Sequence, residues 1–230
     1  MPENSNQPIL KLEDVFKIYK YGELENVILQ GISFEIPHNS MVSVIGPSGS
    51  GKSTLLNILG LLDVPDKGKM FLEGQDISKL SFNDLAEIRG KKIGFVFQQF
   101  NLIQHLSALE NITMPMTFQG KPEPDAIKKA KGLLELVGLS GKENSRPNQL
   151  SGGEQQRVAI ARSLANDPEI ILADEPTGNL DSRTGQAIME TLANLNQKEG
   201  KTVIVVTHDS NISAYCQKSI ILRDGKIVNI

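Results

Sequence analysis

One short polar stretch, GPSGSGKST at residues 46–54, restricts the possible folds of this chain most strongly. It follows the apolar run MVSVI, which is typical of a buried strand, and leads into a segment with a helical pattern at residues 52–62. Its spacing is G-x-x-x-x-G-K-[ST], and between a strand and a helix that spacing is typical of a phosphate-binding loop. The G-x-G-x-x-G spacing of dinucleotide sites is different.

The residue types in this stretch explain how it would hold a phosphate group. Small residues let consecutive backbone N–H groups point at phosphate oxygens, and the start of the following helix adds its positive dipole end. The Lys52 ammonium can reach the β- and γ-phosphates, and the Ser53 hydroxyl can ligate Mg²⁺. A flexible strand-to-helix turn is the alternative interpretation. The residues of the loop expected to contact a nucleotide are Gly46, Pro47, Ser48, Gly49, Ser50, Gly51, Lys52, Ser53 and Thr54.

Two adjacent acids follow a second apolar run, IILA at residues 170–173. An aspartate at the carboxyl end of a buried strand, such as Asp174, is typically associated with the Mg²⁺ of a phosphate site. Glu175 would then lie where it can take a proton from an attacking water. Acids at a strand end also cap turns, which is the alternative for this pair taken alone. A phosphate loop by itself fits kinases, GTPases and ATPases alike, and the acids narrow that choice.

Hydrophobic patterns along the chain predict an α/β fold with two kinds of sheet. Partial alternation at residues 9–19 and 27–36 predicts an antiparallel sheet. Continuous Val/Ile runs that alternate with helical patterns, as at residues 202–207, predict parallel strands covered on both faces. Further expected elements are strands 69–74 and 92–97, a polar helix 81–90 begun by Ser81 or Asn83, helices 154–166 and 184–197, and a terminal hairpin 219–230 with a turn at Asp224 and Gly225.

The pattern is helical, without a strand signal, between Asn101 and Gln149. Helices are expected at residues 106–112 and 125–139, and the prolines expected to bound them are Pro115, Pro122, Pro124 and Pro147. We therefore expect one domain, 1–230. Its core would comprise residues 1–98 and 150–230, with an N-terminal antiparallel β subdomain, and an all-helical lobe at 99–149 would be inserted into it.

Composition and charge exclude several classes of protein. The net charge is −3, from 24 basic and 27 acidic residues, so no overall field would attract nucleic acid or an anionic membrane. The single cysteine, Cys216, forms no internal disulfide, and the first ten residues lack the pattern of a secretory signal. No apolar run approaches the roughly 20 residues that span a bilayer. We expect a cytoplasmic protein that binds no nucleic acid.

A second Ser/Gly corner, LSGGEQQR, begins another expected helix after residue 150. It predicts a second anion site, which could close the open side of a γ-phosphate held by the first corner. With this motif the chain resembles the ATPase subunits of ATP-binding cassette (ABC) transporters, whose signature motif it matches. The resemblance extends from Tyr19 to the final hairpin and rests on several spaced motifs in the family's order. It implies a P-loop NTPase core, with ATP and Mg²⁺ as ligands.

The resemblance also implies roles for residues outside the loop. Glu175 matches the catalytic base, Asp174 the Mg²⁺-associated aspartate, and His208, in VVTHD, the histidine that contacts the γ-phosphate. Gln98, in FVFQQF, matches the glutamine that senses Mg²⁺ and water; Gln99 leaves the register open, but Gln98 directly follows Val-Phe. The remaining matches are Tyr19, which would stack on adenine, Ser151, Gly152 and Gly153 of the signature motif, and Asp181, which would communicate between subunits.

In the family, the signature motif completes the site of a second copy. The resemblance thus implies a two-fold dimer with two ATP molecules between the subunits. It also implies a membrane permease subunit as partner and a peripheral place on the inner face of the cell membrane. The lobe near residues 98–106 would contact that partner, with Phe100, Leu102 and Leu106 as candidates; packing within the lobe is the alternative for each.

The motifs GFVFQQFNL, HLSALENI and ILADEPTGNLDS most resemble the branch for lipoprotein release, macrolide export and cell division. Permeases of that branch have few spans and a large outer domain, and they transmit force. Because the sequence ends at Ile230, directly after the expected hairpin, uptake is less favoured. Two other functions stay open: an ATP-gated regulatory or scaffold module of a cell-division type, and a cytosolic ABC ATPase.

Overall fold

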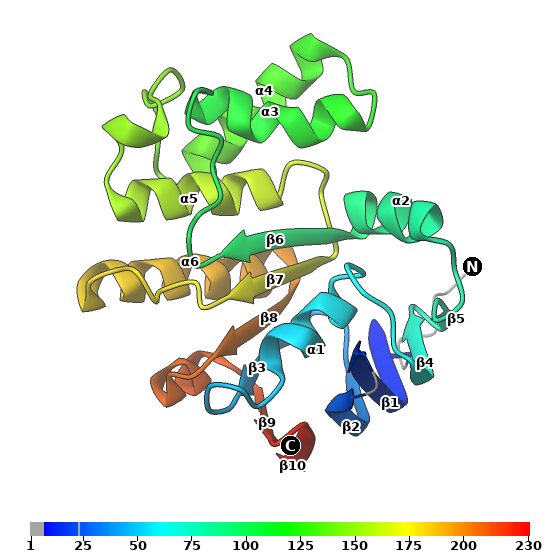
Figure 1. Ribbon diagram of the computed structural model, residues 1–230. Helices are drawn as coiled ribbons and strands as arrows, with labels where there is room; N and C mark the ends of the chain where they lie inside the picture. Colours follow the sequence, from blue (N-terminus) through cyan, green and yellow to red (C-terminus); the bar gives the residue numbers. More distant parts are fainter. Residues whose placement is uncertain (1–6, 23) are drawn as a thin grey trace.

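The computed structural model describes residues 7–22 and 24–230. An antiparallel sheet, in the order β2-β1-β4-β5, begins the fold (Figure 1). The register of β1 shifts where it pairs with β2 and β4, and such irregularities bend a strand locally. The strands are β1 (Leu10–Tyr21), β2 (Leu24–Ile36), β4 (Lys67–Leu72) and β5 (Gln75–Asp76).

A second sheet, in the order β10-β9-β3-β8-β7-β6, forms the centre of the molecule. Strands β9, β3, β8, β7 and β6 run parallel, and only β10 pairs antiparallel, with β9. The predicted mixture of a mostly parallel and an antiparallel sheet is confirmed. The strands are β3 (Met41–Ile45), β6 (Ile93–Phe97), β7 (Ile170–Asp174), β8 (Thr202–Thr207), β9 (Lys218–Arg223) and β10 (Lys226–Asn229).

The two faces of the parallel sheet belong to two separate cores. Ile170 and Leu172 pack into one core with α1 and the antiparallel sheet, whereas Ile171 and Ala173 pack into the other with the helices above. Because successive side chains of a strand point to opposite faces, both sets are buried and the strand is apolar throughout.

Helices α5, α4 and α3 are stacked above the face of the parallel sheet on which α6 also packs (Figure 1). Helix α5 contacts β6 on one side and α3 and α4 on the other, so it joins the helical lobe to the sheet. The predicted boundary between the helical lobe at 99–149 and the core at 150–230 stays a prediction. The helices of the fold are α1 (Lys52–Leu59), α2 (Phe82–Lys92), α3 (Ala108–Phe118), α4 (Glu123–Leu136), η1 (Pro147–Gln149), α5 (Gly152–Ser163), α6 (Ser182–Glu199) and η2 (Ser210–Tyr215).

Pro115 does not bound a helix, contrary to the prediction. It lies inside α3, which runs on to Phe118. A proline there removes one backbone donor. Ile112 and Met116 on either side of it are fully buried in the core, so tertiary packing keeps the helix continuous. Of the two candidate starts for α2, Ser81 is the cap: its side chain accepts from the Asp84 N–H.

Candidate active site

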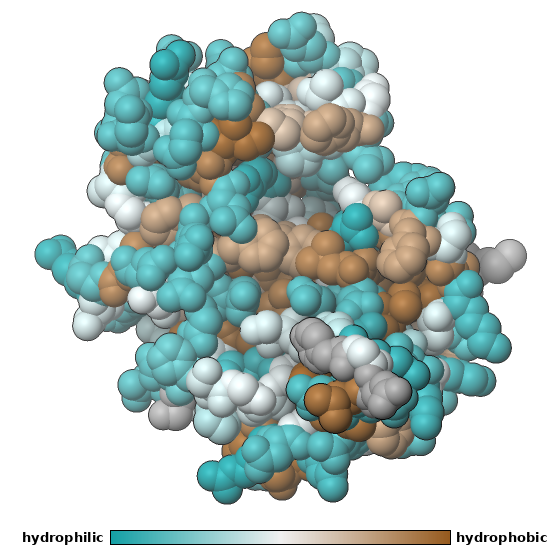
Figure 2. Space-filling model, in the orientation of Figure 1, coloured by the Kyte–Doolittle hydropathy of each residue, from teal (hydrophilic) through white to brown (hydrophobic). Residues whose placement is uncertain are grey.

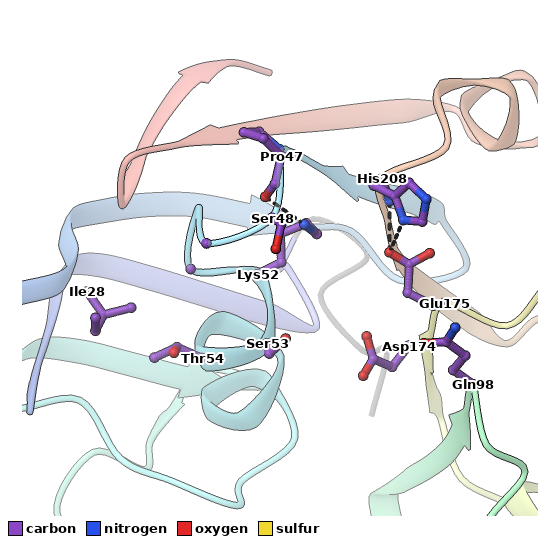
Figure 3. A pocket seen from close by; sticks show the side chains of 12 residues that line it. Ile28, Pro47, Ser48, Lys52, Ser53, Thr54, Gln98, Asp174, Glu175 and His208 are labelled. Atoms are coloured by element: carbon purple, nitrogen blue, oxygen red, sulfur yellow. Dashed lines mark hydrogen bonds and ion pairs between the residues drawn. The ribbon is translucent and has the colours of Figure 1, made fainter. Parts of the chain in front are cut away.

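A cleft of about 790 Å³ lies at the carboxyl ends of β3, β7 and β8 (Figure 3). This is the edge where open α/β sheets place their ligands. Lys52 and Ser53 face Asp174, Glu175, Gln98 and His208 across it. The cleft is lined by Ile28, Pro47, Ser48, Gly49, Gly51, Lys52, Ser53, Thr54, Gln98, Asp174, Glu175 and His208.

Two glycines of the phosphate loop stand where no side chain fits. A Cβ on Gly46 would lie 2.2 Å from the Leu222 carbonyl oxygen, and one on Gly51 would lie 2.9 Å from Leu29 Cδ2. Gly51 also has a φ of 101°, which side chains rarely adopt. The loop is therefore held close to β9 and β2 by its backbone.

The first backbone N–H groups of α1 have no hydrogen-bond partner in the part of the chain that the structure describes. Its cap residue, Gly51, supplies no side-chain hydrogen bond, and the first turn contains no acid. The N–H groups of this turn are thus available for an anion. Lys52 Nζ lies beside them and donates to the carbonyl oxygens of Gly46 and Pro47, at 2.8 and 2.9 Å.

Asp174 and Glu175 project into the cleft from the end of β7. Partial burial and the neighbouring Glu175 charge raise the pKa of Asp174, while Lys52 counteracts them. Glu175 has a φ of 44°, an uncommon backbone conformation for this residue type. Its N–H donates to Val206 O at 2.8 Å, which ties the turn to β8.

The Glu175 carboxylate is held by groups that follow β8. Thr207 Oγ1 donates to Glu175 Oε2 at 2.9 Å, and the His208 N–H donates to Oε1 at 3.0 Å. His208 Nδ1 lies 2.7 Å from the same Oε1 (Figure 3). The histidine side chain is 69% exposed, against 17% for the glutamate. The imidazole is thus at the mouth of the cleft and the carboxylate is deeper.

Gln98, and not Gln99, lines the cleft. Its Nε2 donates to Asn179 Oδ1 at 3.3 Å, and Asn179 Nδ2 returns a bond to Gln98 O at 2.9 Å. These bonds connect the end of β6 with the segment that follows Glu175. Gly178 lies so close that a Cβ on it would be 2.7 Å from Gln98 Nε2.

The other expected contact residues lie outside the cleft lining. Gly46 and Ser50 belong to the loop but face inward, and the buried Ser50 Oγ has no hydrogen-bond partner among the described residues. Tyr19 is half-buried, and its hydroxyl donates to Asp63 Oδ2 at 3.2 Å. Burial and then the Asp63 carboxylate raise the pKa of Tyr19. The ring is therefore anchored to the core beside the loop.

The signature residues lie at the start of α5. Ser151 is its exposed cap and accepts from the Glu154 N–H at 3.3 Å. Gly153 is buried against α6, since a Cβ there would lie 2.4 Å from Thr184 Cγ2. Asp181 caps α6 and accepts from Thr184 N and Oγ1, and these bonds lower the pKa of Asp181. Together with Gly152, these residues are absent from the lining of their own chain's cleft.

Two residues of the site were missed by the sequence analysis. Ile28 lines the cleft beside Thr54 (Figure 3), but its place in an ordinary strand pattern gives no signal. Thr207 holds Glu175 from the next strand, and the pairing of β7 with β8 is what brings the two together. Neither contact follows from local sequence.

The donor set of the cleft fits Mg²⁺. Ser53 offers a hydroxyl, Asp174 a carboxylate and Gln98 an amide oxygen, and all are the hard oxygen ligands that Mg²⁺ prefers. Within the described residues, the carboxylate oxygens of Asp174 accept no hydrogen bond and are thus available to a metal ion. Within residues 7–22 and 24–230, no helix combines the length and hydropathy of a membrane span.

Comparison with known proteins identifies the family. Residues 29–178 match the family described as "ABC transporter".

This chain belongs to the ABC transporter family.

It is an ABC-type ATPase domain that binds ATP. An uncharacterised ABC transporter ATP-binding protein of Thermotoga maritima is 53% identical over 96% of this chain and 94% of its own length. The macrolide export ATP-binding/permease protein MacB of Chlorobaculum tepidum is 46% identical over 96% of this chain and 34% of its own length.

Solved structures agree with this assignment. The cassette MJ0796, in a dimeric post-hydrolysis state with ADP and phosphate, superposes with a TM-score of 0.87 at 48% identity, and the match covers 96% of this chain and 97% of that one. CbiO1 of Clostridium perfringens, part of the transporter complex CbiONQ, gives the same TM-score at 28% identity, over 97% of this chain and 88% of that one. The predicted fold class and family are confirmed.

Proposed function

We propose that two copies of this chain close on two ATP molecules and that hydrolysis drives a membrane permease. The observation that carries this proposal is that the cleft contains only part of the expected ATP site. Lys52, Ser53 and Glu175 lie in it, whereas Ser151 is exposed elsewhere on the surface. A second copy with its α5 start placed over the cleft would complete the site. The dimeric structure of the related MJ0796 supports this arrangement.

The residues of the cleft divide the chemistry between them. Phosphate oxygens would replace the Gly46 and Pro47 carbonyls as partners of Lys52 Nζ, because a charge-assisted bond to phosphate is stronger than one to a neutral carbonyl. Ser53, Asp174 and Gln98 would hold Mg²⁺, which neutralises charge on the phosphates when bound. Glu175, held by Thr207 and His208, would orient a water molecule and accept its proton.

The His208 ring can contact one of two negatively charged groups, the Glu175 carboxylate or a γ-phosphate. In this structure its ring lies on Glu175, at the mouth of the cleft. A γ-phosphate in the cleft would offer it a second, more highly charged acceptor. Movement of the ring from carboxylate to phosphate would free a Glu175 oxygen for water. His208 is therefore assigned to sense the γ-phosphate.

Tyr19, which lies beside the loop with its hydroxyl bonded to Asp63, is assigned to stack on adenine.

The permease is proposed to dock on a groove of about 680 Å³ between α2, α3 and α5. Apolar side chains collect between these helices and β6 (Figure 2), and Phe118 at the rim is 80% exposed. Of the residues expected there, Leu102 is buried in the core, whereas Phe100 packs against that core and, like Leu106, stays partly exposed. Asn101 and Phe97 line the groove in their place.

We assign the permease to the type with few spans and a large outer domain, as in lipoprotein release and macrolide export, and the ATPase to the inner face of the cell membrane. The MacB relatives support this assignment, since this chain spans about a third of those ATP-binding/permease proteins. ATP and Mg²⁺ are the expected ligands, and a second copy and the permease are the expected partners.

The proposal is tested with the variant Glu175→Gln. It should bind ATP, elute as a dimer from a sizing column with ATP and Mg²⁺, and lose hydrolysis by a factor of about 10² or more, because the base is gone. Lys52→Ala is the control that should bind ATP poorly and stay monomeric. A monomeric Glu175→Gln protein under these conditions would contradict the dimer.

A tagged Glu175→Gln protein should then be recovered from gently solubilised membranes with ATP and Mg²⁺. A permease with few spans and a large outer domain is the expected companion, and Lys52→Ala should recover less of it. A regulatory partner without transport activity would favour the cell-division alternative. Soluble partners alone would favour a cytosolic ATPase and overturn the permease assignment.

A further inference from the structure

One of the buried polar side chains, that of Gln156, contacts the backbone next to Glu175 but has no part in the proposed chemistry. Gln156 lies on α5 and is 0% exposed. Its Nε2 donates to the carbonyl oxygen of Pro176 at 2.7 Å, and its Oε1 has no hydrogen-bond partner in the described part of the chain. Burying an amide is costly unless its groups are hydrogen-bonded. The contact with Pro176 is thus what this side chain contributes in the described structure.

Pro176 directly follows Glu175, so the contact reaches the backbone of the site. Glu175 is held on its other side by β8, through its N–H to Val206 O and through the bonds from Thr207 and His208. Gln156 fixes the chain immediately after it. The left-handed φ of 44° at Glu175 needs such support from both sides, because the surrounding structure must hold an uncommon conformation in place.

The same helix carries the signature corner. Ser151 caps α5, and Gln156 lies about one and a half turns further along it. The segment after Glu175 also touches this helix, since a Cβ on Gly152 would lie 3.3 Å from Leu180 Cδ2. A displacement of α5 would therefore move the Pro176 peptide, which directly follows Glu175.

We propose that Gln156 is a positioning residue for Glu175, and that it connects the signature end of α5 to the hydrolysis site of the same chain. This inference rests on the proposed function. In the dimer, Ser151 would contact the ATP of the partner copy, whereas Gln156 would hold the backbone beside this chain's own Glu175. Closure at one ATP would thus set the geometry at the other.

The first test is the variant Gln156→Met, which keeps the side-chain length but cannot donate to Pro176 O. We expect kcat to fall about tenfold, because catalytic groups tolerate little misplacement, while KM for ATP and the affinity for a non-hydrolysed ATP analogue stay within about twofold of wild type. The steepness of the ATP dependence should also fall, since the two sites would be less coupled.

A matched control separates positioning from stability. Asn196 is also buried, and its Nδ2 donates to the carbonyls of Asn39 and Lys201, at the opposite end of the sheet from the cleft. Asn196→Leu should lower Tm without changing kcat at temperatures where it is folded. Equal losses of kcat in the two variants at equal losses of Tm would overturn the proposal.

A second variant keeps the test decisive if Gln156→Met folds poorly. In Gln156→Glu, a protonated carboxyl can donate to Pro176 O and an ionised one cannot. Its kcat relative to wild type should therefore fall as pH rises. A ratio that is independent of pH would overturn the proposal, as would an unchanged kcat in Gln156→Met. Failure of the proposed function looks different, because wild type and Glu175→Gln would then hydrolyse ATP equally.

Discussion

At the scale of single residues, the cleft concentrates negative charge at a cost to stability. Asp174 and Glu175 are adjacent and partly buried, and burial together with Glu175 raises the pKa of Asp174. A carboxyl whose pKa is higher in the folded state destabilises that state when it is ionised. The destabilisation is present at neutral pH and disappears when pH falls below the ordinary pKa of an aspartate.

Asp174→Asn should therefore stabilise the ligand-free protein and abolish its activity. At neutral pH we expect a gain of about 1 kcal/mol or less in the free energy of unfolding, because partial exposure screens the charge. The gain should vanish toward pH 3, where the aspartate is protonated in both states. Denaturant melts at several pH values measure it. A variant less stable than wild type at pH 7 would contradict the assignment.

At the scale of elements, the terminal hairpin supports the phosphate loop. The Gly225 N–H donates to Ser50 O at 3.1 Å, and Gly225 O accepts from the Gln30 N–H at 2.8 Å. This turn, between β9 and β10, thus joins the loop to β2, whose Ile28 lines the cleft. A Cβ on Gly225 would lie 2.2 Å from Ile28 O, so the backbones are in direct contact.

Gly225→Ala should weaken ATP binding more than it changes turnover. The added methyl group would push β2 away from the turn that holds the loop, and we expect KM for ATP to rise about tenfold with kcat changed less. Gly138→Ala is the matched control: its φ of 70° is close to the 72° of Gly225, but a Cβ there meets nothing within 4 Å. Similar kinetics of the two variants would refute the steric argument.

The secondary structure shows where local rules were sufficient. The cap at Ser81 and the Asp224–Gly225 turn follow from residue chemistry, and the structure has both. Pro115 shows the opposite case, because the burial of Ile112 and Met116 outweighs the lost backbone bond. Burial of that kind depends on α4 and α5, which lie later in the chain.

At the scale of the whole molecule, the proposed dimer makes each site from two chains. Lys52→Ala and Ser151→Ala should each be nearly inactive alone, since neither variant can assemble an intact site from its own copies. Mixed together, they should recover activity, because a dimer with one copy of each contains one intact site. The recovery should reach at most about a quarter of the wild-type rate, because random pairing puts one copy of each in half of the dimers and only one of their two sites is intact.

The mixture is measured as ATPase rate against the ratio of the two proteins. The control mixes Lys52→Ala with the double variant Lys52→Ala, Ser151→Ala, which forms no intact site and should stay inactive. Activity that stays at the level of the separate proteins would argue against sites shared between chains.

The sequence alone determined the place of the glycine-rich loop between a strand and a helix, the acids after IILA and the order of the main strands and helices, because each depends on spacing within a few residues. Only the tertiary structure decided which distant groups meet. His208 lies on Glu175, Gly225 on Ser50, and Gln156 on Pro176. These contacts depend on strand order and on helices that cross the sheet, for which no local pattern exists. The sequence alone therefore does not distinguish Gln156 from the other polar residues of its helix, and only the fold places Pro176 against it.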